Sequence, residues 1–362
     1  MARLSGLAAV LSTGLMTVSH LAAPAHAGPA LLLEAESGQV LYSDDPDQPW
    51  YPASLTKMMT AYLTFEALKS GKVKPDDEVP LSRHARGQPA TRIGLRAGIK
   101  LTYDGAVRGM ILRSANDFAV ALAEALAGSE EAFAERMNAT AKRLGMTRTK
   151  FRNPHGLPDD GQVSTARDMA KLTLALSRDF PHWSEVFSSH SVRIHKGTFY
   201  NQNDILRTLE GADGMKTGFT CGSGYNIVAS ATRDGHRLIA VVLGEQTRVK
   251  RSQRVTALIE HGFAVLGWKQ LAAQPIRLAT LELSPDAAEA APDTSSMVRI
   301  GHCPFHRPAK DTATVASATD RPAAAVRPPA TVTRGSANLA GAVPNIKLNI
   351  QPDAKAVPGG GR

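Results

Sequence analysis

A chain of 362 residues, 43% of them hydrophobic, has room for one large or two ordinary domains and enough apolar side chains for a packed core. Its net charge of +9 raises the possibility of a nucleic-acid partner, but no segment combines basic and aromatic residues as nucleic-acid-binding modules do. We therefore expect no nucleic acid, and anionic polymers or membrane surfaces suit the charge better.

The first 27 residues have the pattern of a secretory signal peptide. Arg3 provides a short basic start, residues 4–21 are largely apolar, and residues 25–27 have the Ala-x-Ala pattern of a cleavage site. Polar residues interrupt the apolar stretch and Pro24 follows it, which favours a cleaved signal over a membrane anchor. We expect residues 1–27 to be removed and the mature protein to be exported, to the periplasm or the cell envelope.

In chain order, the hydrophobic pattern predicts a hairpin and then a series of helices. The hairpin covers residues 30–43, and helices are predicted over 54–68, over the two halves of 104–126, over 130–144 and over 165–177. Two apolar strands, 225–232 and 237–243, flank the turn signal Arg233-Asp234-Gly235-His236, and a last helix is predicted over 252–266. Strands near both ends thus bracket a helical middle. This order predicts an α+β fold with an antiparallel sheet flanked by helices and a helical subdomain.

The composition changes after residue 268. Residues 284–362 are rich in Ala, Pro, Thr and Gly, so they bury too little apolar surface to offset the entropy of ordering. We predict a folded domain over 28–268, followed over 269–362 by a linker and a disordered C-terminal tail. For the two cysteines, Cys221 and Cys303, we expect no structural disulfide. No metal is expected at residues 302–306, because only three potential ligands cluster there.

Three short strings carry the residue types of a catalytic site: Ser54-Leu55-Thr56-Lys57, Ser114-Ala115-Asn116 and Lys216-Thr217-Gly218. A serine is a poor nucleophile until a neighbouring group takes its proton. Residues three apart share one face of a helix, so Ser54 and Lys57 can meet. A lysine accepts a proton only when burial or a nearby cation lowers its pKa, and Lys216 is the candidate cation. An isolated Ser-x-x-Lys is most often a helix N-cap, but the three strings in this order favour an enzyme.

These strings, with four longer segments, resemble the low-molecular-mass penicillin-binding proteins that are serine-type D-alanyl-D-alanine carboxypeptidases. The longer segments are residues 52–58, 151–157, 164–170 and 213–220. The resemblance covers residues 30–266 and implies a β-lactamase/transpeptidase-like fold whose catalytic domain is the predicted domain 28–268. It also implies peptidoglycan stem peptides as substrates, β-lactam antibiotics as covalent inhibitors, and no cofactor.

The resemblance assigns catalytic roles to three residues. Ser54 would be the nucleophile that is acylated, and Lys57 would be its base. Ser114 would relay a proton to the leaving D-alanine. His155, in the segment 151–157, fits a loop-shaping role better than a catalytic one.

The resemblance also assigns residues that bind the substrate. Asn116 would hold the peptide amide, Lys216 would tune the site electrostatically, and the remaining contacts would come from Thr217, Gly218, Phe219 and Arg251. Thr217 and Gly218 would line an edge strand, and the N–H groups of Ser54 and Phe219 would form the oxyanion hole. Arg251 would receive the terminal carboxylate, although the residues alone do not choose among Arg248, Arg251 and Arg254; the spacing from Lys216 favours Arg251.

Two alternatives stay open. A β-lactamase shares the acylation groups, but we find no Glu-x-x-Leu-Asn string that supplies the deacylating glutamate of class A enzymes. The other alternative is a non-catalytic wall-binding protein on the same scaffold, and the presence of Ser54 and Lys57 argues against it. Larger family members end in an amphipathic membrane-binding helix, whereas residues 345–350 are too short for one, so membrane attachment is left undecided.

Overall fold

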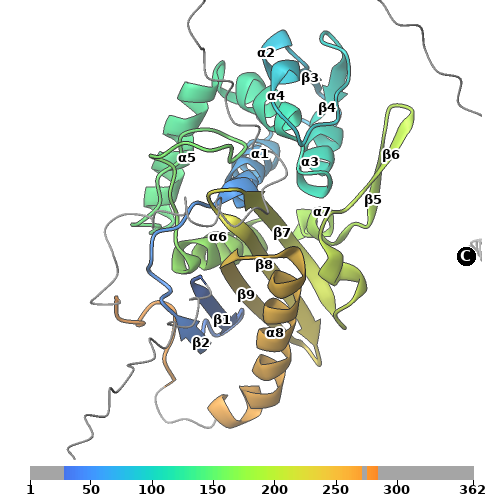
Figure 1. Cartoon of the computed structure of the whole chain (residues 1–362). Helices are drawn as coiled ribbons and strands as arrows, with labels where there is room; N and C mark the ends of the chain where they lie inside the picture. The colour runs from blue at the N-terminus through green and yellow to red at the C-terminus, as the bar shows by residue number, and fades with distance from the viewer. Residues whose placement is uncertain (1–27, 271–274, 284–362) are drawn as a thin grey trace, which may run out of the picture. The chain divides into compact units, whose positions relative to one another are not determined.

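The structure is a computed structural model that describes residues 28–270 and 275–283 (Figure 1). The predicted signal peptide, the predicted disordered tail from residue 284 onward and the cluster at 302–306 lie outside the described residues. None of the helices in the described ranges is long and apolar enough to cross a membrane.

The centre of the fold is a five-stranded antiparallel sheet with the strand order β2-β1-β9-β8-β7. Its strands are β1 (Ala30–Glu34), β2 (Val40–Asp44), β7 (Ala212–Thr220), β8 (Gly224–Arg233) and β9 (His236–Glu245). The N-terminal hairpin joins the C-terminal strands because β1 pairs with β9, with Leu32 opposite Ala240. This arrangement confirms the predicted sheet made from both ends of the chain, and it leaves β7 at one edge.

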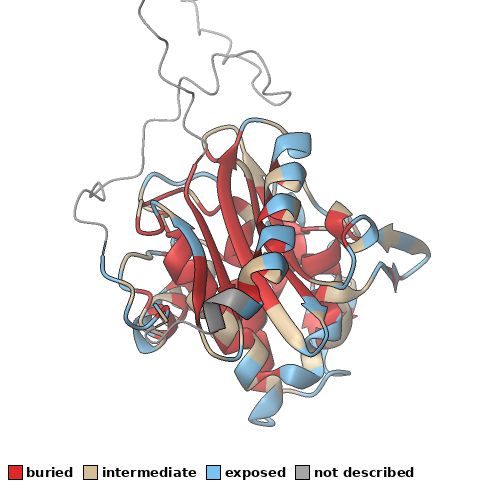
Figure 2. Ribbon diagram, turned by 90° about the horizontal axis from the view of Figure 1, so that it is seen from below, coloured by how far each residue is buried: buried red, intermediate tan, exposed pale blue. Residues whose placement is uncertain are grey.

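Both faces of the sheet are covered, which explains why its strands are apolar on both sides. Leu31 and Leu33 of β1 belong to a core on the side of the helical region, whereas Leu32 belongs to a second core under α8 (Arg248–Gln270). The same period of two recurs in β9, where Ile239 and Val241 face the first core. Figure 2 shows these strands as buried beneath α8, whose outer side is exposed.

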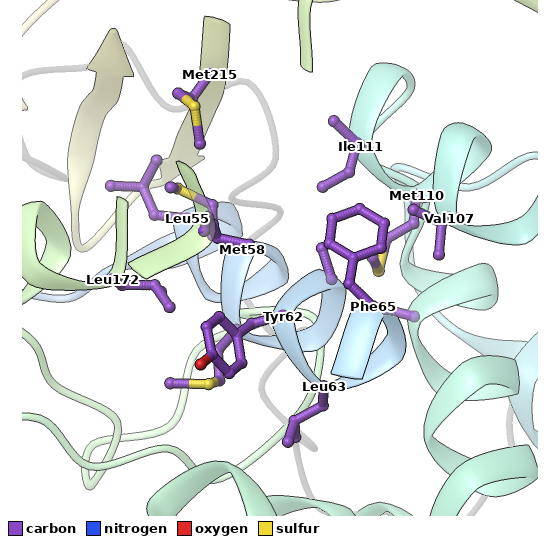
Figure 3. Close-up of a cluster of buried hydrophobic side chains, with 14 of the residues drawn as sticks. Leu55, Met58, Tyr62, Leu63, Phe65, Val107, Met110, Ile111, Leu172 and Met215 are labelled. Carbon is purple, nitrogen blue, oxygen red and sulfur yellow. The ribbon is translucent and has the colours of Figure 1, made fainter. Parts of the chain in front are cut away.

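The helical region packs around α1 (Lys57–Lys69), which follows the short 3₁₀ turn η1 (Ala53–Thr56). The other helices are α2 (Arg83–Gly87), α3 (Tyr103–Leu112), α4 (Asn116–Ala127), α5 (Glu130–Arg143), α6 (Ala166–Asp179) and α7 (Glu185–Ser188). Nearly every residue of α1 is buried, because helices surround it. Figure 3 shows Met58 and Phe65 of α1 between Met110 of α3 and Leu172 of α6. The helix that carries the first motif is thus fixed on several sides.

The structure contains short elements that the hydrophobic pattern does not predict. They are the short helices α2 and α7, the hairpin β3 (Glu78–Pro80) with β4 (Lys100–Thr102), the hairpin β5 (Ser191–Ile194) with β6 (Gly197–Tyr200), and two 3₁₀ turns, η2 (Pro181–Trp183) and η3 (Asp204–Arg207). Strands of three or four residues are too short to establish a period of two. The last helix also begins at Arg248 rather than at residue 252, so Arg251 lies in its first turn.

Residues 275–283, which the predicted boundary at residue 268 assigns to the linker, pack against the domain. The Val40 N–H donates to the Ile276 carbonyl at 2.8 Å, and Leu278 is buried. Arg167 of α6 makes a buried ion pair with Asp47 at 2.5 Å, and its guanidinium also donates to the Leu281 carbonyl at 2.7 Å. Such an irregular segment has no periodic pattern, so only its contacts reveal that the packed chain extends beyond the predicted boundary.

The expectation of no structural disulfide is wrong at Cys221, which is disulfide-bonded in the structure. Cys221 lies in the half-buried turn between β7 and β8, and Cys303, the other cysteine of the chain, lies outside the described residues. A disulfide requires only that two cysteines approach with suitable geometry, which composition does not report.

Candidate active site

The first motif forms a tight turn at the start of α1. Ala53 has a φ of +49°, in the left-handed region that residues with a side chain rarely adopt, and Ser54 follows it in η1. The helix predicted from residue 54 thus begins as a 3₁₀ turn, in which side chains three apart lie almost in line. As a result, the Lys57 Nζ lies 3.1 Å from the Ser54 Oγ. Ser54 is half-buried, so its hydroxyl is within reach of a substrate.

Lys57 is completely buried and has two further partners. Its Nζ donates to the Asn116 Oδ1 at 2.7 Å and to the backbone oxygen of His155 at 2.5 Å. These two oxygens only accept hydrogen bonds, whereas the Ser54 hydroxyl can also donate. A neutral amine has two N–H groups and one lone pair. The arrangement therefore suits a neutral Lys57 that satisfies both acceptors and receives the hydroxyl hydrogen of Ser54.

The second and third motifs supply another buried pair. The Lys216 Nζ donates to the Ser114 Oγ at 3.0 Å and to the Thr217 carbonyl at 2.8 Å, and Lys216 is 2% exposed. Ser114 has a φ of +61° between α3 and α4, a strained conformation that costs roughly 1–3 kcal/mol. Asn116 begins α4, and its Nδ2 donates to the Pro89 carbonyl at 3.0 Å, so both polar groups of its side chain are engaged.

Burial and a neighbouring positive charge depress the pKa of each lysine. Burial lowers the pKa of Lys57 well below its ordinary value, the positive charge of Lys216 lowers it further, and Asp117 raises it in part. Burial, followed by the charge of Arg251, lowers the pKa of Lys216 to about 7. Removing charge from water disfavours the ammonium form, which is why both shifts have the same sign. The site therefore favours the neutral form of Lys57.

The edge strand β7 passes directly beside the nucleophile turn. A Cβ atom at Gly218 would lie 3.0 Å from the Pro52 carbonyl and 3.1 Å from the Ser54 nitrogen, so the strand approaches this closely because residue 218 is glycine. Thr217 is buried, and the half-buried Phe219 packs against Tyr225 of β8 with the two rings tilted and their centroids 4.2 Å apart. The predicted residues of the third motif are thus grouped next to Ser54.

Arg251 lies beyond Lys216, in the first turn of α8. It is 4% exposed, and its Nη2 donates to the Asp204 Oδ1 at 2.6 Å. Its Nε is buried and has no hydrogen-bond partner among the described residues. The other two arginines that the sequence offers for the terminal carboxylate have different surroundings. Arg254 donates to the Gly28 carbonyl at 2.7 Å, and the Arg248 side chain is 59% exposed. Of these three arginines, Arg251 is the one whose charge lowers the pKa of Lys216.

Comparison with known proteins agrees with this arrangement. A model of the peptidase S11 family, D-alanyl-D-alanine carboxypeptidase, matches residues 16–247. The chain belongs to this family of D-alanyl-D-alanine carboxypeptidases. It is 42% identical over 240 residues to the D-alanyl-D-alanine carboxypeptidase DacC of Escherichia coli, an alignment that covers 64% of this chain and 60% of the relative. The chain thus spans about 60% of the length of the relatives it matches.

Solved structures of penicillin-binding proteins share the fold. Penicillin binding protein 5 from Haemophilus influenzae is 39% identical and superposes with a TM-score of 0.64, covering 66% of this chain and 71% of that one. Penicillin-Binding Protein D2 from Listeria monocytogenes, in its ampicillin-bound form, is 34% identical with a TM-score of 0.61 and covers 66% of this chain and 97% of that one. These neighbours confirm the predicted β-lactamase/transpeptidase-like fold.

Asn226 is a structural residue of this site that the motifs in the sequence do not indicate. Its side chain is completely buried on β8, and its Nδ2 donates to the Tyr51 carbonyl at 2.9 Å and to the Pro52 carbonyl at 3.3 Å. Its Oδ1 accepts the Gly244 N–H at 2.8 Å. Asn226 thus ties the sheet to the segment that precedes Ser54. The signal in the sequence is the one amide side chain of β8, which stands directly before the apolar residues Ile227, Val228 and Ala229.

Replacing Asn226 with alanine should therefore lower the free energy of unfolding by about 1–3 kcal/mol, because buried backbone groups lose their partners. Urea unfolding followed by circular dichroism measures this loss. Thr198→Ala, at an exposed position of β6, is the control and should be nearly neutral. A loss below about 0.5 kcal/mol for Asn226→Ala would contradict the anchoring role.

Proposed function

We propose that this protein is a serine D-Ala-D-Ala carboxypeptidase that removes the terminal D-alanine from peptidoglycan stem peptides through an acyl-enzyme on Ser54. The observation that carries the proposal is the buried Lys57, whose two acceptor-only partners leave its lone pair for the Ser54 hydroxyl. Family membership and the fold shared with penicillin-binding proteins support the same reaction.

Acylation begins with proton transfer from the Ser54 hydroxyl to Lys57 as the Oγ attacks the carbonyl carbon between the two D-alanines. The negative charge that develops on the carbonyl oxygen is stabilised by the N–H groups of Ser54 on η1 and Phe219 on β7, which would form the oxyanion hole. The close approach of Gly218 to the Ser54 nitrogen supports this oxyanion hole.

The C–N bond then breaks, and Ser114 passes its hydroxyl hydrogen to the leaving amine of D-alanine while the proton that Lys57 accepted replaces it, which makes Lys57 neutral again. Ser114 suits the relay because its Oγ accepts a hydrogen bond from Lys216 at 3.0 Å and its own hydrogen is free to point elsewhere. Water subsequently hydrolyses the ester on Ser54, which releases the shortened peptide and restores the serine.

The substrate backbone lies along the edge of β7, where an extended peptide adds to a sheet by main-chain hydrogen bonds. Thr217 and Gly218 line this edge, Asn116 borders it from α4, and Lys216 supplies positive charge. At its end, Arg251 binds the free carboxylate of the terminal D-alanine. β-Lactam antibiotics acylate the same serine, as the ampicillin-bound form of the Listeria protein supports. The proposed location is the cell envelope or periplasm, after export.

A mass-spectrometric assay tests the proposed reaction. A purified muropeptide that ends in D-Ala-D-Ala is incubated with the protein, and the loss of one alanine per peptide is the expected result. An unchanged peptide would overturn the proposal. Rapid steady-state hydrolysis of penicillin would favour a β-lactamase instead, and failure of both reactions would favour a non-catalytic wall-binding protein.

Arg251→Ala should slow the cleavage of a D-Ala-D-Ala peptide at least about tenfold, because charge-assisted hydrogen bonds to a carboxylate contribute roughly 1.5–3 kcal/mol. A peptide whose C-terminus is amidated offers no carboxylate and should be affected much less. Initial rates of D-alanine or D-alaninamide release measure both effects. Equal slowing of the two substrates, or no slowing of either, would assign the carboxylate to another group, with Arg248 and Arg254 as the next candidates.

A further inference from the structure

A carboxylate outside the proposed site lies between two histidines. Glu130 is in the first turn of α5, and its Oε1 lies 2.5 Å from the Nε2 of His84 on α2. Its Oε2 lies 3.3 Å from the Nε2 of His155. The side chains of Glu130 and His155 are 14% and 6% exposed, whereas His84 is 63% exposed. The contact with His155 is therefore the buried one, and exposed pairs such as that with His84 contribute little.

The ring of His155 has a defined orientation. Its Nδ1 accepts the Leu157 N–H at 3.0 Å, so in the neutral ring the proton is on Nε2, which faces Glu130. Burial lowers the pKa of His155, which keeps the ring neutral. One nitrogen thus holds its own loop and the other holds α5.

The same residue touches the proposed base through its backbone. The His155 carbonyl accepts a hydrogen bond from the Lys57 Nζ at 2.5 Å. The following residue, Gly156, has a φ of +88°, and a Cβ atom there would overlap the Ala53 carbonyl, so the loop lies directly against the nucleophile turn. A shift of the His155 ring would therefore move the His155 carbonyl. It would also change the direction of the Lys57 lone pair, because the amine is hydrogen-bonded to that carbonyl.

We infer that Glu130 is a positioning residue for Lys57 and acts through the His155 ring, an inference that rests on the proposed function. It touches neither the substrate nor the reacting atoms. Its carboxylate fixes the ring, the ring fixes the loop, and the loop carbonyl fixes one of the two N–H directions of the amine. Orientation of this kind matters, since a misplacement of about 1 Å in an active site can cost on the order of a hundredfold in rate.

Acylation kinetics test the inference. Glu130→Ala should lower the second-order rate constant for acylation by a fluorescent penicillin at least about tenfold. Glu130→Gln, which can still accept the Nε2–H of His155, should recover most of that rate. The matched control is Glu131→Ala, because Glu131 is the next residue of the same helical turn and is exposed; its rate should stay within twofold of the wild type.

A double-mutant cycle separates this role from a general structural one. In His155→Asn, the new amide oxygen can replace the Nδ1 as acceptor for Leu157 but cannot reach Glu130. Adding Glu130→Ala to that variant should change the rate less than twofold, because the path is already broken. The ¹⁵N signal of the His155 Nε2 should also move in Glu130→Ala and not in Glu131→Ala.

The outcomes are distinguishable. Absence of acylation in the wild type would mean that the proposed function fails, and this inference with it. A wild type that is acylated normally, together with a Glu130→Ala variant within twofold of its rate, would overturn the inference alone. Equal losses from Glu130→Ala in the wild-type and His155→Asn backgrounds would also overturn it.

Discussion

Replacing Ser54 with alanine should abolish covalent labelling by a fluorescent penicillin and the release of D-alanine from a D-Ala-D-Ala peptide. The reason is that the hydroxyl is the atom that forms the ester, and the neighbouring lysines provide no substitute for it. The change removes one oxygen from a half-buried side chain, so the fold should persist, with an unchanged circular dichroism spectrum. Gel fluorescence and intact-protein mass spectrometry measure the label.

Ser114→Ala is the control for this experiment, because Ser114 is a second serine of the same site, hydrogen-bonded to Lys216. It should still be labelled, at a reduced rate, because the nucleophile remains. If the Ser54→Ala variant is still labelled, or if only the Ser114→Ala variant loses the label, the nucleophile would be Ser114 instead.

Replacing Lys57 with methionine should lower the acylation rate by about 10²–10⁴-fold, the contribution typical of one positioned proton carrier. Methionine fills the buried space of the lysine stem without a charged or basic group. Lys57→Arg adds a second test, since a guanidinium keeps the positive charge but cannot lose its proton in a protein. Both variants should be slow if Lys57 acts as a base. Stopped-flow acylation by a chromogenic β-lactam measures the rates.

Lys69→Met is the matched control, because Lys69 is at the exposed end of the same helix, where its Nζ donates to the Asp179 carbonyl at 2.9 Å. Its acylation rate should equal that of the wild type. A Lys57→Met protein that stays folded and acylates within threefold of the wild type would show that another group takes the proton. A Lys57→Arg variant as fast as the wild type would show that only the charge matters.

Local sequence patterns were sufficient to predict most strands of the sheet and the longer helices. Two apolar runs on either side of a turn signal predicted β8 and β9. The helix predicted from residue 165 also begins there, because the Thr165 side chain caps it by accepting the Asp168 N–H at 3.0 Å. These features depend on residues close in sequence, which is why they can be predicted. The short hairpins β3–β4 and β5–β6 depend on what surrounds them, and no local pattern indicated them.

The break between α3 and α4 shows where local patterns stop. The hydrophobic pattern predicts a helix over each half of residues 104–126, but it does not indicate that Ser114, between the halves, adopts a left-handed conformation or that its hydroxyl meets Lys216. A serine has no intrinsic preference for that conformation, so the surrounding structure imposes it. The second motif indicated that Ser114 is important, but its strained backbone and its hydrogen bond with Lys216 depend on the packing of the folded chain.

By itself, the sequence determined that Ser54 and Lys57 are neighbours, because three-residue spacing on a helical turn brings them together, and its motifs determined the family. Only the tertiary structure decided what makes the lysine a base: complete burial, the acceptors Asn116 and His155 at 2.7 and 2.5 Å, and the charge of Lys216. Residues 59 and 98 positions away from Lys57 supply those acceptors. Burial and long-range hydrogen bonds are properties of the packed chain, since they depend on which distant segments exclude water from the same place.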